Sequence, residues 1–287
     1  MARKIGLALG GGGARGLAHL GVYQRLTELG VPVHCVAGTS IGAIAGALIA
    51  AGTVDRALAW CAEPDWKKFP KLMFETRLTA KAITTGRQVE RLLADLIVAK
   101  RFDDLKIPFA SVATDLNSGE KVVLREGDLL SAVRASMSIP GVFLPVERDG
   151  RVLVDGQLMD PVPVSVCRAM GADVVIAVDI NPPNPPENAK PLSKLNLIDI
   201  MAGTLTVLNC ELTRRELAEA PPDMLIRPAV GGVMALDFRR AERLVEIGRQ
   251  AVEDASVRER LEDWVIGGVG DWRIGGLDKR STNGAAT

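Results

Sequence analysis

The stretch IGLALGGGGARGLAHLGVYQRLTELG, residues 5–30, decides the class of fold. Residues 4–9 form a short apolar run that ends in glycines, which is typical of a buried parallel strand. Residues 14–29 follow with leucines and a valine spaced to give one apolar helical face, and Gly30 is the expected helix stop. This stretch therefore predicts a strand, a glycine-rich turn and a helix.

The same order of elements recurs directly afterwards. Residues 33–37 predict a second strand, and the alanine-rich residues 41–51 predict a second helix. Further strands are expected at 109–114, 121–124, 151–154, 174–178 and 224–226, and further helices at 88–99, 163–170, 195–219 and 239–254. Strands that alternate with helices predict an α/β protein, here a three-layer α/β/α fold with a mainly parallel central sheet.

The chain has neither a repeat nor a clear linker. The proline-rich residues 181–191 follow a predicted strand closely, so we expect an extended surface loop there rather than a domain boundary. Residues 276–287 are small and polar, which predicts a flexible tail. We therefore expect a single domain over residues 1–275.

Composition narrows the classes of partner. Apolar residues make up 47% of the chain, and 35 basic residues balance 35 acidic ones, so no net field favours nucleic acid. Four scattered cysteines fit reduced thiols better than disulfides or a zinc site. The apolar run 41–52 is shorter than the ~18 residues that a membrane span needs, and the N-terminus lacks a signal-peptide core. The expected location is the cytoplasm, with peripheral contact at the inner membrane surface.

A serine lies between two glycines in GTSIGAIAG, residues 38–46. In the pattern G-x-S-x-G, Gly38 and Gly42 allow a sharp strand-to-helix turn that exposes the hydroxyl of Ser40. The N-terminus of the following helix favours developing negative charge at this point. The pattern predicts a catalytic nucleophile, and the alternative is a serine that only caps a closely packed helix.

The glycine run GGGGARG, residues 10–16, allows three interpretations. A dinucleotide-binding loop would need an acidic residue near the end of the second strand, where residues 36–39 are VAGT. A phosphate-binding loop would need Lys-Ser/Thr after Gly16, where Leu17 and Ala18 stand instead. The third interpretation, which we favour, is an oxyanion hole whose backbone N–H groups lie at the same sheet edge as Ser40.

The group that would activate Ser40 is not a conventional histidine. The two histidines, His19 and His34, both precede Ser40, which excludes the chain order of an α/β-hydrolase triad. We expect His19 to pack the first helix or brace the glycine loop, and His34 to be a packed or surface residue. A serine–lysine pair of the S-x-x-K kind is excluded because residue 43 is alanine.

Carboxylates remain as candidate bases. Asp115, Asp155 and Asp179 each end an apolar strand, in ATDLNSG, RVLVDG and IAVDINP. A buried aspartate beside Ser40 would accept its proton if the site raised the basicity of the carboxylate. Position alone does not choose among the three.

Three blocks of the chain resemble those of the patatin-like phospholipase family, in the order that the family has them. They are GGGGARG, GTSIG and VDGQLMDPVPV, and the segments ATDLNSGE and ASMSIPGVFLPV resemble its bacterial branch. The likeness spans about residues 4–230. It implies a patatin-like fold and a serine–aspartate dyad without histidine, metal or cofactor, which makes Ser40 the nucleophile and Asp155 its base.

The resemblance also assigns the surrounding residues. Those implied are Gly11, Gly12, Gly13 and Arg15 around the oxyanion, Gly38 and Gly42 in the elbow and Gly156 beside the acid. The chain departs from the family pattern at Gln157, where glycine or alanine is common. We expect this change to leave the dyad intact and to alter the hydrogen bonding of the acid or the rim of the pocket.

The activity that the resemblance implies is hydrolysis of acyl esters of phospholipids or related lipids through an acyl-serine intermediate. Alternatives are a non-lipolytic esterase or thioesterase, and a regulatory or binding protein with a vestigial site. Residues 66–83 interleave basic and aromatic side chains, which suits a membrane-contacting segment or flap, or else an amphipathic helix packed on the core. The apolar segment 195–212 is a candidate wall of an acyl pocket or a homo-oligomer interface.

Overall fold

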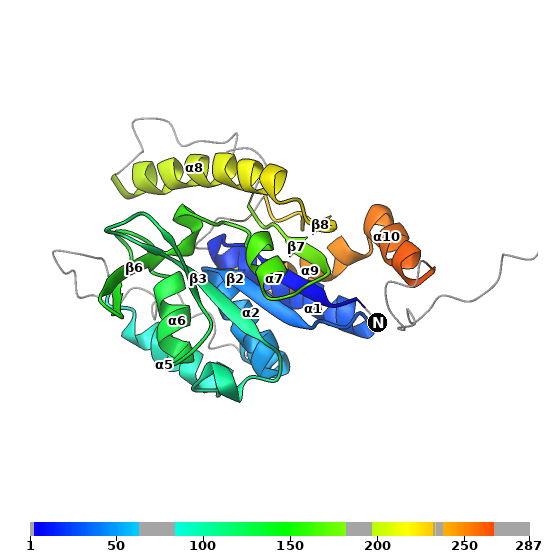
Figure 1. Ribbon diagram of the computed structural model, residues 1–287, viewed down its shortest axis with the longest axis horizontal. Coiled ribbons are helices and arrows are strands. Elements are labelled where there is room, and N and C mark those ends of the chain that lie inside the picture. The colour runs from blue at the N-terminus through cyan, green and yellow to red at the C-terminus, as the bar shows by residue number, and fades with distance from the viewer. Residues whose placement is uncertain (1–2, 63–83, 182–196, 232, 234–237, 267–287) are drawn as a thin grey trace, which may run out of the picture.

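The computed structural model describes residues 3–62, 84–181, 197–231, 233 and 238–266. In this part of the chain an eight-stranded sheet forms the centre of the molecule (Figure 1). Its strands are β1 (Ile5–Leu9), β2 (Cys35–Thr39), β3 (Phe109–Asp115), β4 (Lys121–Leu124), β5 (Val146–Arg148), β6 (Arg151–Asp155), β7 (Val174–Val178) and β8 (Met224–Ile226).

The sheet is parallel at its centre and antiparallel at one side. The strand order is β5-β6-β3-β2-β1-β7-β8, with β4 also paired to β3. In the run β3-β2-β1-β7-β8, each strand pairs in parallel with the next. Strands β4 and β6 pair antiparallel with β3, and β5 does so with β6. The predicted α/β fold is confirmed, and the antiparallel strands make the sheet mixed.

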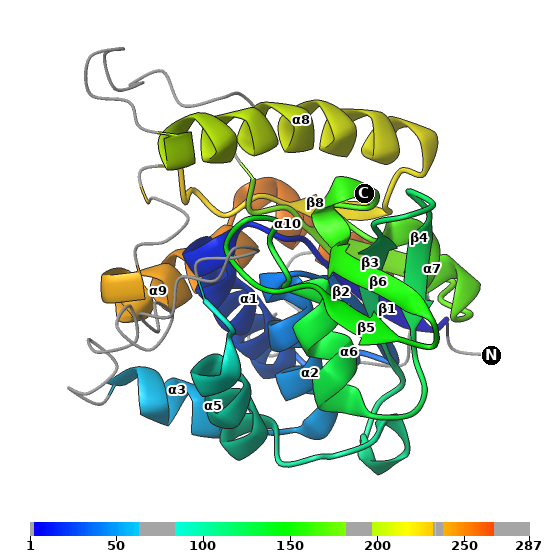
Figure 2. The same ribbon diagram turned by 90° about the vertical axis from the view of Figure 1, so that its left-hand side faces the viewer.

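Helices cover both faces of the sheet (Figures 1 and 2). The described helices are α1 (Leu17–Glu28), α2 (Ile41–Ala51), α3 (Val54–Ala62), α5 (Arg87–Ile97), α6 (Leu129–Ser136), α7 (Val164–Ala169), α8 (Leu197–Glu219), α9 (Ala241–Val252) and α10 (Ala255–Ile266), with short 3-10 turns at Gly13–Gly16, Phe102–Asp104, Gly156–Leu158 and Phe238–Arg240. Both views show α8 on the opposite side of the molecule from α2, α3 and α5.

Alternation along β1 divides the core in two, because successive side chains of a strand point to opposite faces. Ile5, Leu7 and Leu9 belong to the larger apolar cluster, which includes residues of α1, α2 and α6. Ala8 belongs to the smaller cluster on the other face, together with Cys167 of α7. The result is the three-layer arrangement that the sequence predicts.

Helix α9 crosses α1 at very short range because both helices carry a glycine at the crossing. A Cβ atom on Gly21 would lie 1.9 Å from the backbone oxygen of Val245, and one on Gly248 would lie 2.0 Å from that of Ala18. No side chain fits at either position without moving a helix. This crossing holds α9 in place beside the site described below.

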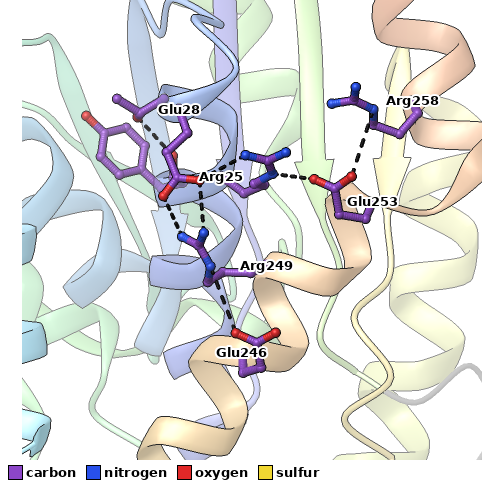
Figure 3. A network of polar contacts seen from close by, with 8 residues as sticks. Arg25, Glu28, Glu246, Arg249, Glu253 and Arg258 are labelled. Atoms are coloured by element: carbon purple, nitrogen blue, oxygen red, sulfur yellow. Dashed lines mark hydrogen bonds and ion pairs between the residues drawn. The ribbon is translucent and has the colours of Figure 1, made fainter. Parts of the chain in front are cut away.

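Ion pairs continue this contact between α1 and α9 (Figure 3). Arg249 binds both carboxylate oxygens of Glu28, at 2.8 and 2.9 Å, and Arg25 contacts Glu28 and Glu253. These side chains are partly exposed, so their pairing contributes little compared with the glycine crossing.

Most predicted elements are present, with small differences at their ends. The strands at 121–124, 174–178 and 224–226 and the helix at 41–51 match the structure residue for residue. The predicted helix 14–29 begins as a 3-10 turn, and its α-helical part starts only at Leu17. Helices α3, α6 and α10 and the short strand β5 were not predicted.

Some expectations are not tested by the described residues. The basic and aromatic segment 66–83 and the tail 276–287 lie outside them, as does most of the loop 181–191. The single-domain boundaries therefore stay a prediction. None of the helices in the described part of the chain combines the length and the apolar composition that crossing a bilayer requires.

Candidate active site

Ser40 stands at the junction of β2 and α2 in an unusual backbone conformation. Its φ is 57° and its ψ is −121°, a region that costs a non-glycine residue roughly 1–3 kcal/mol. The flanking glycines permit the tight turn: a Cβ on Gly38 would lie 2.2 Å from the oxygen of Gly42, and one on Gly42 would lie 2.2 Å from the oxygen of Leu9. The elbow expected from G-x-S-x-G is thus formed.

A second serine holds this elbow. The N–H of Ser40 donates to Ser136 Oγ at 2.8 Å, and that hydroxyl donates to the backbone oxygen of Val112 at 2.5 Å. Ser136 ends α6 and is fully buried. Sequence reasoning missed this residue, since the only hint was its place in the family-like segment ASMSIPGVFLPV.

The hydroxyl of Ser40 donates to Asp155 Oδ2 at 2.6 Å. Both side chains are buried, with 2% and 3% of their surface exposed. Burial raises the pKa of Asp155 to about 7, although hydrogen bonds from Ser40 and from the backbone N–H of Gln157 oppose the rise. A carboxylate that titrates near neutral pH is suited to take a proton and return it.

The register of β3 brings these two residues together. Val112 pairs with Thr39 of β2, and the next residue, Ala113, pairs with Asp155 of β6. The backbone N–H of Asp155 donates to the oxygen of Ser138 at 3.0 Å, which fixes the end of β6 against the segment after α6. An antiparallel strand therefore delivers the acid to the end of a parallel strand.

The two other candidate carboxylates have different partners. Asp115 accepts hydrogen bonds from the N–H of Asn117 and the hydroxyl of Ser118, and so stabilises the turn between β3 and β4. Asp179 accepts from Arg227 Nε at 3.1 Å. Neither is hydrogen-bonded to Ser40, which separates Asp155 from its rivals.

The glycine loop lies beside the serine, as expected for adjacent parallel strands. The N–H of Gly11 donates to the oxygen of Pro161 at 3.0 Å, so this amide anchors the loop and is not free to bind an oxyanion. Within the described residues, no group accepts a hydrogen bond from the N–H of Gly12 or Gly13. Gly13 has a φ of 63°, a conformation that favours glycine. Two of the expected amides are therefore available.

Arg15 and His19 hold the glycine loop in place through hydrogen bonds to backbone oxygens. Arg15 is buried, and its Nε donates to the oxygen of Val233 at 2.8 Å, so its guanidinium is tied to the segment before α9. Burial lowers the pKa of His19 to about 4, so the ring is neutral, and its Nε2–H donates to the oxygen of Gly10 at 2.8 Å. The expected bracing role of His19 is confirmed.

His34 and Gly156, the remaining residues singled out in the sequence, support the local structure. His34 lies just before β2, where its Nδ1 accepts from the N–H of Ile5 at 2.9 Å. Gly156 packs against β3, since a Cβ there would lie 2.2 Å from the oxygen of Val112. Position 156, next to Asp155, therefore has room only for glycine.

An apolar cavity of about 100 Å³ opens at the serine. Ser40 and Gly13 line it together with side chains from α1, α2, α5 and the segment after α6, among them Leu20, Ile44, Leu48, Val89, Leu93 and Phe143. None of the described residues of α8 lines it, so the idea that this helix forms the pocket wall is not supported. A cavity of this kind suits an alkyl chain.

Known proteins resemble this chain over most of its length. The family model of patatin-like phospholipases matches residues 7–168, which hold all three blocks from the glycine loop to the acid. An uncharacterized NTE family protein of Mycobacterium tuberculosis is 34% identical, over 91% of this chain and 93% of its own length. The chain therefore belongs to the patatin-like phospholipase family, and this membership supports lipid hydrolase activity.

Two further proteins resemble this chain at lower identity. Mouse patatin-like phospholipase domain-containing protein 7 is 29% identical over 92% of this chain but only 21% of its own length. Among solved structures, VipD from Legionella pneumophila has a TM-score of 0.52 at 14% identity, and the match covers 92% of this chain and 67% of VipD. At this identity the likeness concerns the fold alone.

Proposed function

We propose that this chain is a serine hydrolase that cleaves acyl ester bonds of lipids, with Ser40 as nucleophile and Asp155 as base. The observation that carries the proposal is the 2.6 Å hydrogen bond from Ser40 Oγ to Asp155 Oδ2 beside an apolar cavity. Covalent acyl transfer needs a nucleophilic hydroxyl that is hydrogen-bonded to a base, here a carboxyl group whose pKa lies near neutral pH.

The proposed reaction has two stages. Ser40 Oγ attacks the ester carbonyl while its proton passes to Asp155 Oδ2, and the N–H groups of Gly12 and Gly13 bind the oxyanion. When the tetrahedral intermediate collapses, the leaving alcohol takes that proton and the acyl group stays on Ser40. Asp155 then takes a proton from water, which attacks the acyl-serine, and returns that proton to Ser40 Oγ as the fatty acid leaves.

The cavity favours long acyl chains over short ones. Its lining side chains are apolar apart from the serine itself, so each buried methylene of a substrate contributes about 0.8 kcal/mol. This argues for a lipid substrate over a short soluble ester or thioester, and against a vestigial site. Peripheral contact with a membrane and a cytoplasmic location remain part of the proposal.

The test is hydrolysis of p-nitrophenyl esters of acetate, octanoate and palmitate and of phospholipid vesicles. We expect kcat/KM to rise with chain length, and Ser40→Ala and Asp155→Asn to lose at least about a thousandfold in kcat. Asp115→Asn is the matched control, because it removes a rival carboxylate that has its own partners. A preference for acetate with no vesicle hydrolysis would favour the non-lipolytic esterase.

A further inference from the structure

Gln157 occupies the place after Gly156 where the family pattern has a small residue, and its side chain is buried within the site. Only 9% of its surface is exposed. Its backbone N–H donates to Asp155 Oδ1 at 2.9 Å, opposite the oxygen that Ser40 uses. The residue is therefore fixed to the acid by its backbone, which leaves the side chain free for another role.

That side chain lies directly over the glycine loop. A Cβ on Gly11 would lie 2.3 Å from both Cγ and Cδ of Gln157 and 2.7 Å from its Oε1. The carboxamide therefore fills space beside Gly11 that a glycine or alanine at position 157 would leave open. Among the described residues no hydrogen bond of this carboxamide is found, and its atoms are not among the fully enclosed polar atoms that lack a partner, so its donors and acceptor stay accessible to a molecule that enters the site.

The position of Gln157 relative to the dyad defines which part of a substrate it meets. Ser40 and Gly13 line the apolar cavity, whereas Gly11, Asp155 and Gln157 do not. The acyl chain is thus on one side of the nucleophile. In the proposed reaction the leaving alcohol takes its proton from Asp155, so it must lie on the side of the carboxylate, where Gln157 is.

We propose that Gln157 determines leaving-group selectivity, a proposal that rests on the hydrolase function above. Its bulk restricts the size of the alcohol portion, and its carboxamide hydrogen-bonds a hydroxyl of a glycerol-type alcohol. A carboxamide at the edge of the site discriminates between alcohols, because a bound alcohol that covers it without pairing leaves its donors and acceptor desolvated, whereas an alcohol with a hydroxyl in reach satisfies them.

The test uses three oleoyl esters that differ only in the alcohol: methanol, glycerol and glycerophosphocholine. Gln157→Leu keeps the bulk and removes the hydrogen bond, so the kcat/KM of the glycerol ester relative to the methyl ester should fall about tenfold. Gln157→Gly opens the space, so the kcat/KM of the glycerophosphocholine ester relative to the methyl ester should rise about tenfold. Circular dichroism verifies that both variants are folded.

Ratios between esters are the readout because a general loss of activity cancels in them. Gln250→Leu, on the surface of α9, is the matched control and should leave both ratios as in the parent. Unchanged ratios in both Gln157 variants, with the parent active, would overturn this inference and leave the hydrolase function standing. A folded parent that hydrolyses none of the three esters would overturn both.

Discussion

Ser40 Oγ donates to Asp155 Oδ2 at 2.6 Å although 115 residues separate the two in the chain. The contact arises because Thr39 and Asp155 pair with consecutive residues of β3. The position of the acid is therefore a property of the sheet register, and a slip of one residue in β6 would turn the carboxylate to the other face. Because β3 pairs with β2 in parallel and with β6 antiparallel, the end of β2 and the end of β6 lie beside each other.

Ser136→Ala should weaken catalysis without altering substrate binding. The substitution leaves the N–H of Ser40 and the oxygen of Val112 without their shared partner, which costs about 1–3 kcal/mol of stability. Because the strained elbow then loses its anchor, we expect kcat to fall about tenfold or more with KM unchanged. Ser131→Ala, on the same helix, is the control. An unchanged kcat in a variant with lowered Tm would show that Ser136 supports only folding.

The activity should depend on the ionisation of one group near neutral pH. The pKa of Asp155 is raised to about 7, and only its charged form accepts the proton of Ser40. For an uncharged ester, kcat/KM should rise with pH, reach half of its maximum near pH 7 and level off above it. A profile that is flat between pH 5.5 and pH 9, or that falls as pH rises, would contradict the role of Asp155 as base.

Asp155 should lower the stability of the fold as pH rises. Its pKa is about 7 in the folded chain and ~3.9 in an unfolded one, so between these values the folded state holds a proton that the unfolded state has lost. The contribution of Asp155 to the free energy of unfolding therefore declines by up to about 1.4 kcal/mol per pH unit from pH 4 to pH 7 and is constant above.

The variant Asp155→Asn removes this effect. Denaturant unfolding of parent and variant between pH 4 and pH 8 should show the variant gaining stability relative to the parent up to about pH 7. The non-titrating control Thr27→Ala should differ from the parent by a constant amount. A constant offset for Asp155→Asn as well would mean that the carboxyl is not buried in a neutral form.

Gly11→Ala should be damaging because of Gln157 and not because of backbone conformation. Gly11 is not among the glycines with positive φ, so the obstacle to a Cβ is the Gln157 side chain. We expect a loss of about 1–3 kcal/mol in stability, which Gln157→Gly largely relieves. A double-mutant cycle measured by Tm and by activity tests this, and an equal cost of Gly11→Ala in both backgrounds would show that the two residues do not meet.

The sequence was sufficient for the elements that carry the elbow and the glycine loop. Local patterns place Ser40 between a strand and a helix, and adjacent parallel strands place residues 10–16 beside it. The sequence did not identify which of Asp115, Asp155 and Asp179 lies beside Ser40, because all three end apolar strands. What separates them is pairing across the sheet and side-chain partners such as Arg227, and neither is local in sequence.

Two further features had no local signal. Ser136 acts through a hydrogen bond to a residue 96 positions away, and its own segment has no capping or catalytic pattern. The N–H of Gly11 looked equivalent to those of Gly12 and Gly13 in the sequence, and only its bond to Pro161 shows that it is an anchor. Tertiary hydrogen bonds, which composition and periodicity do not encode, account for both.

The most direct measurement is labelling with a fluorophosphonate probe followed by mass spectrometry of the peptide that carries it. If Ser40 and Asp155 form a dyad, we expect one modification, on Ser40, in the parent, none in Ser40→Ala, and a rate at least about a hundredfold lower in folded Asp155→Asn. Modification of another serine, or equal labelling of parent and Asp155→Asn, would contradict a dyad of Ser40 and Asp155.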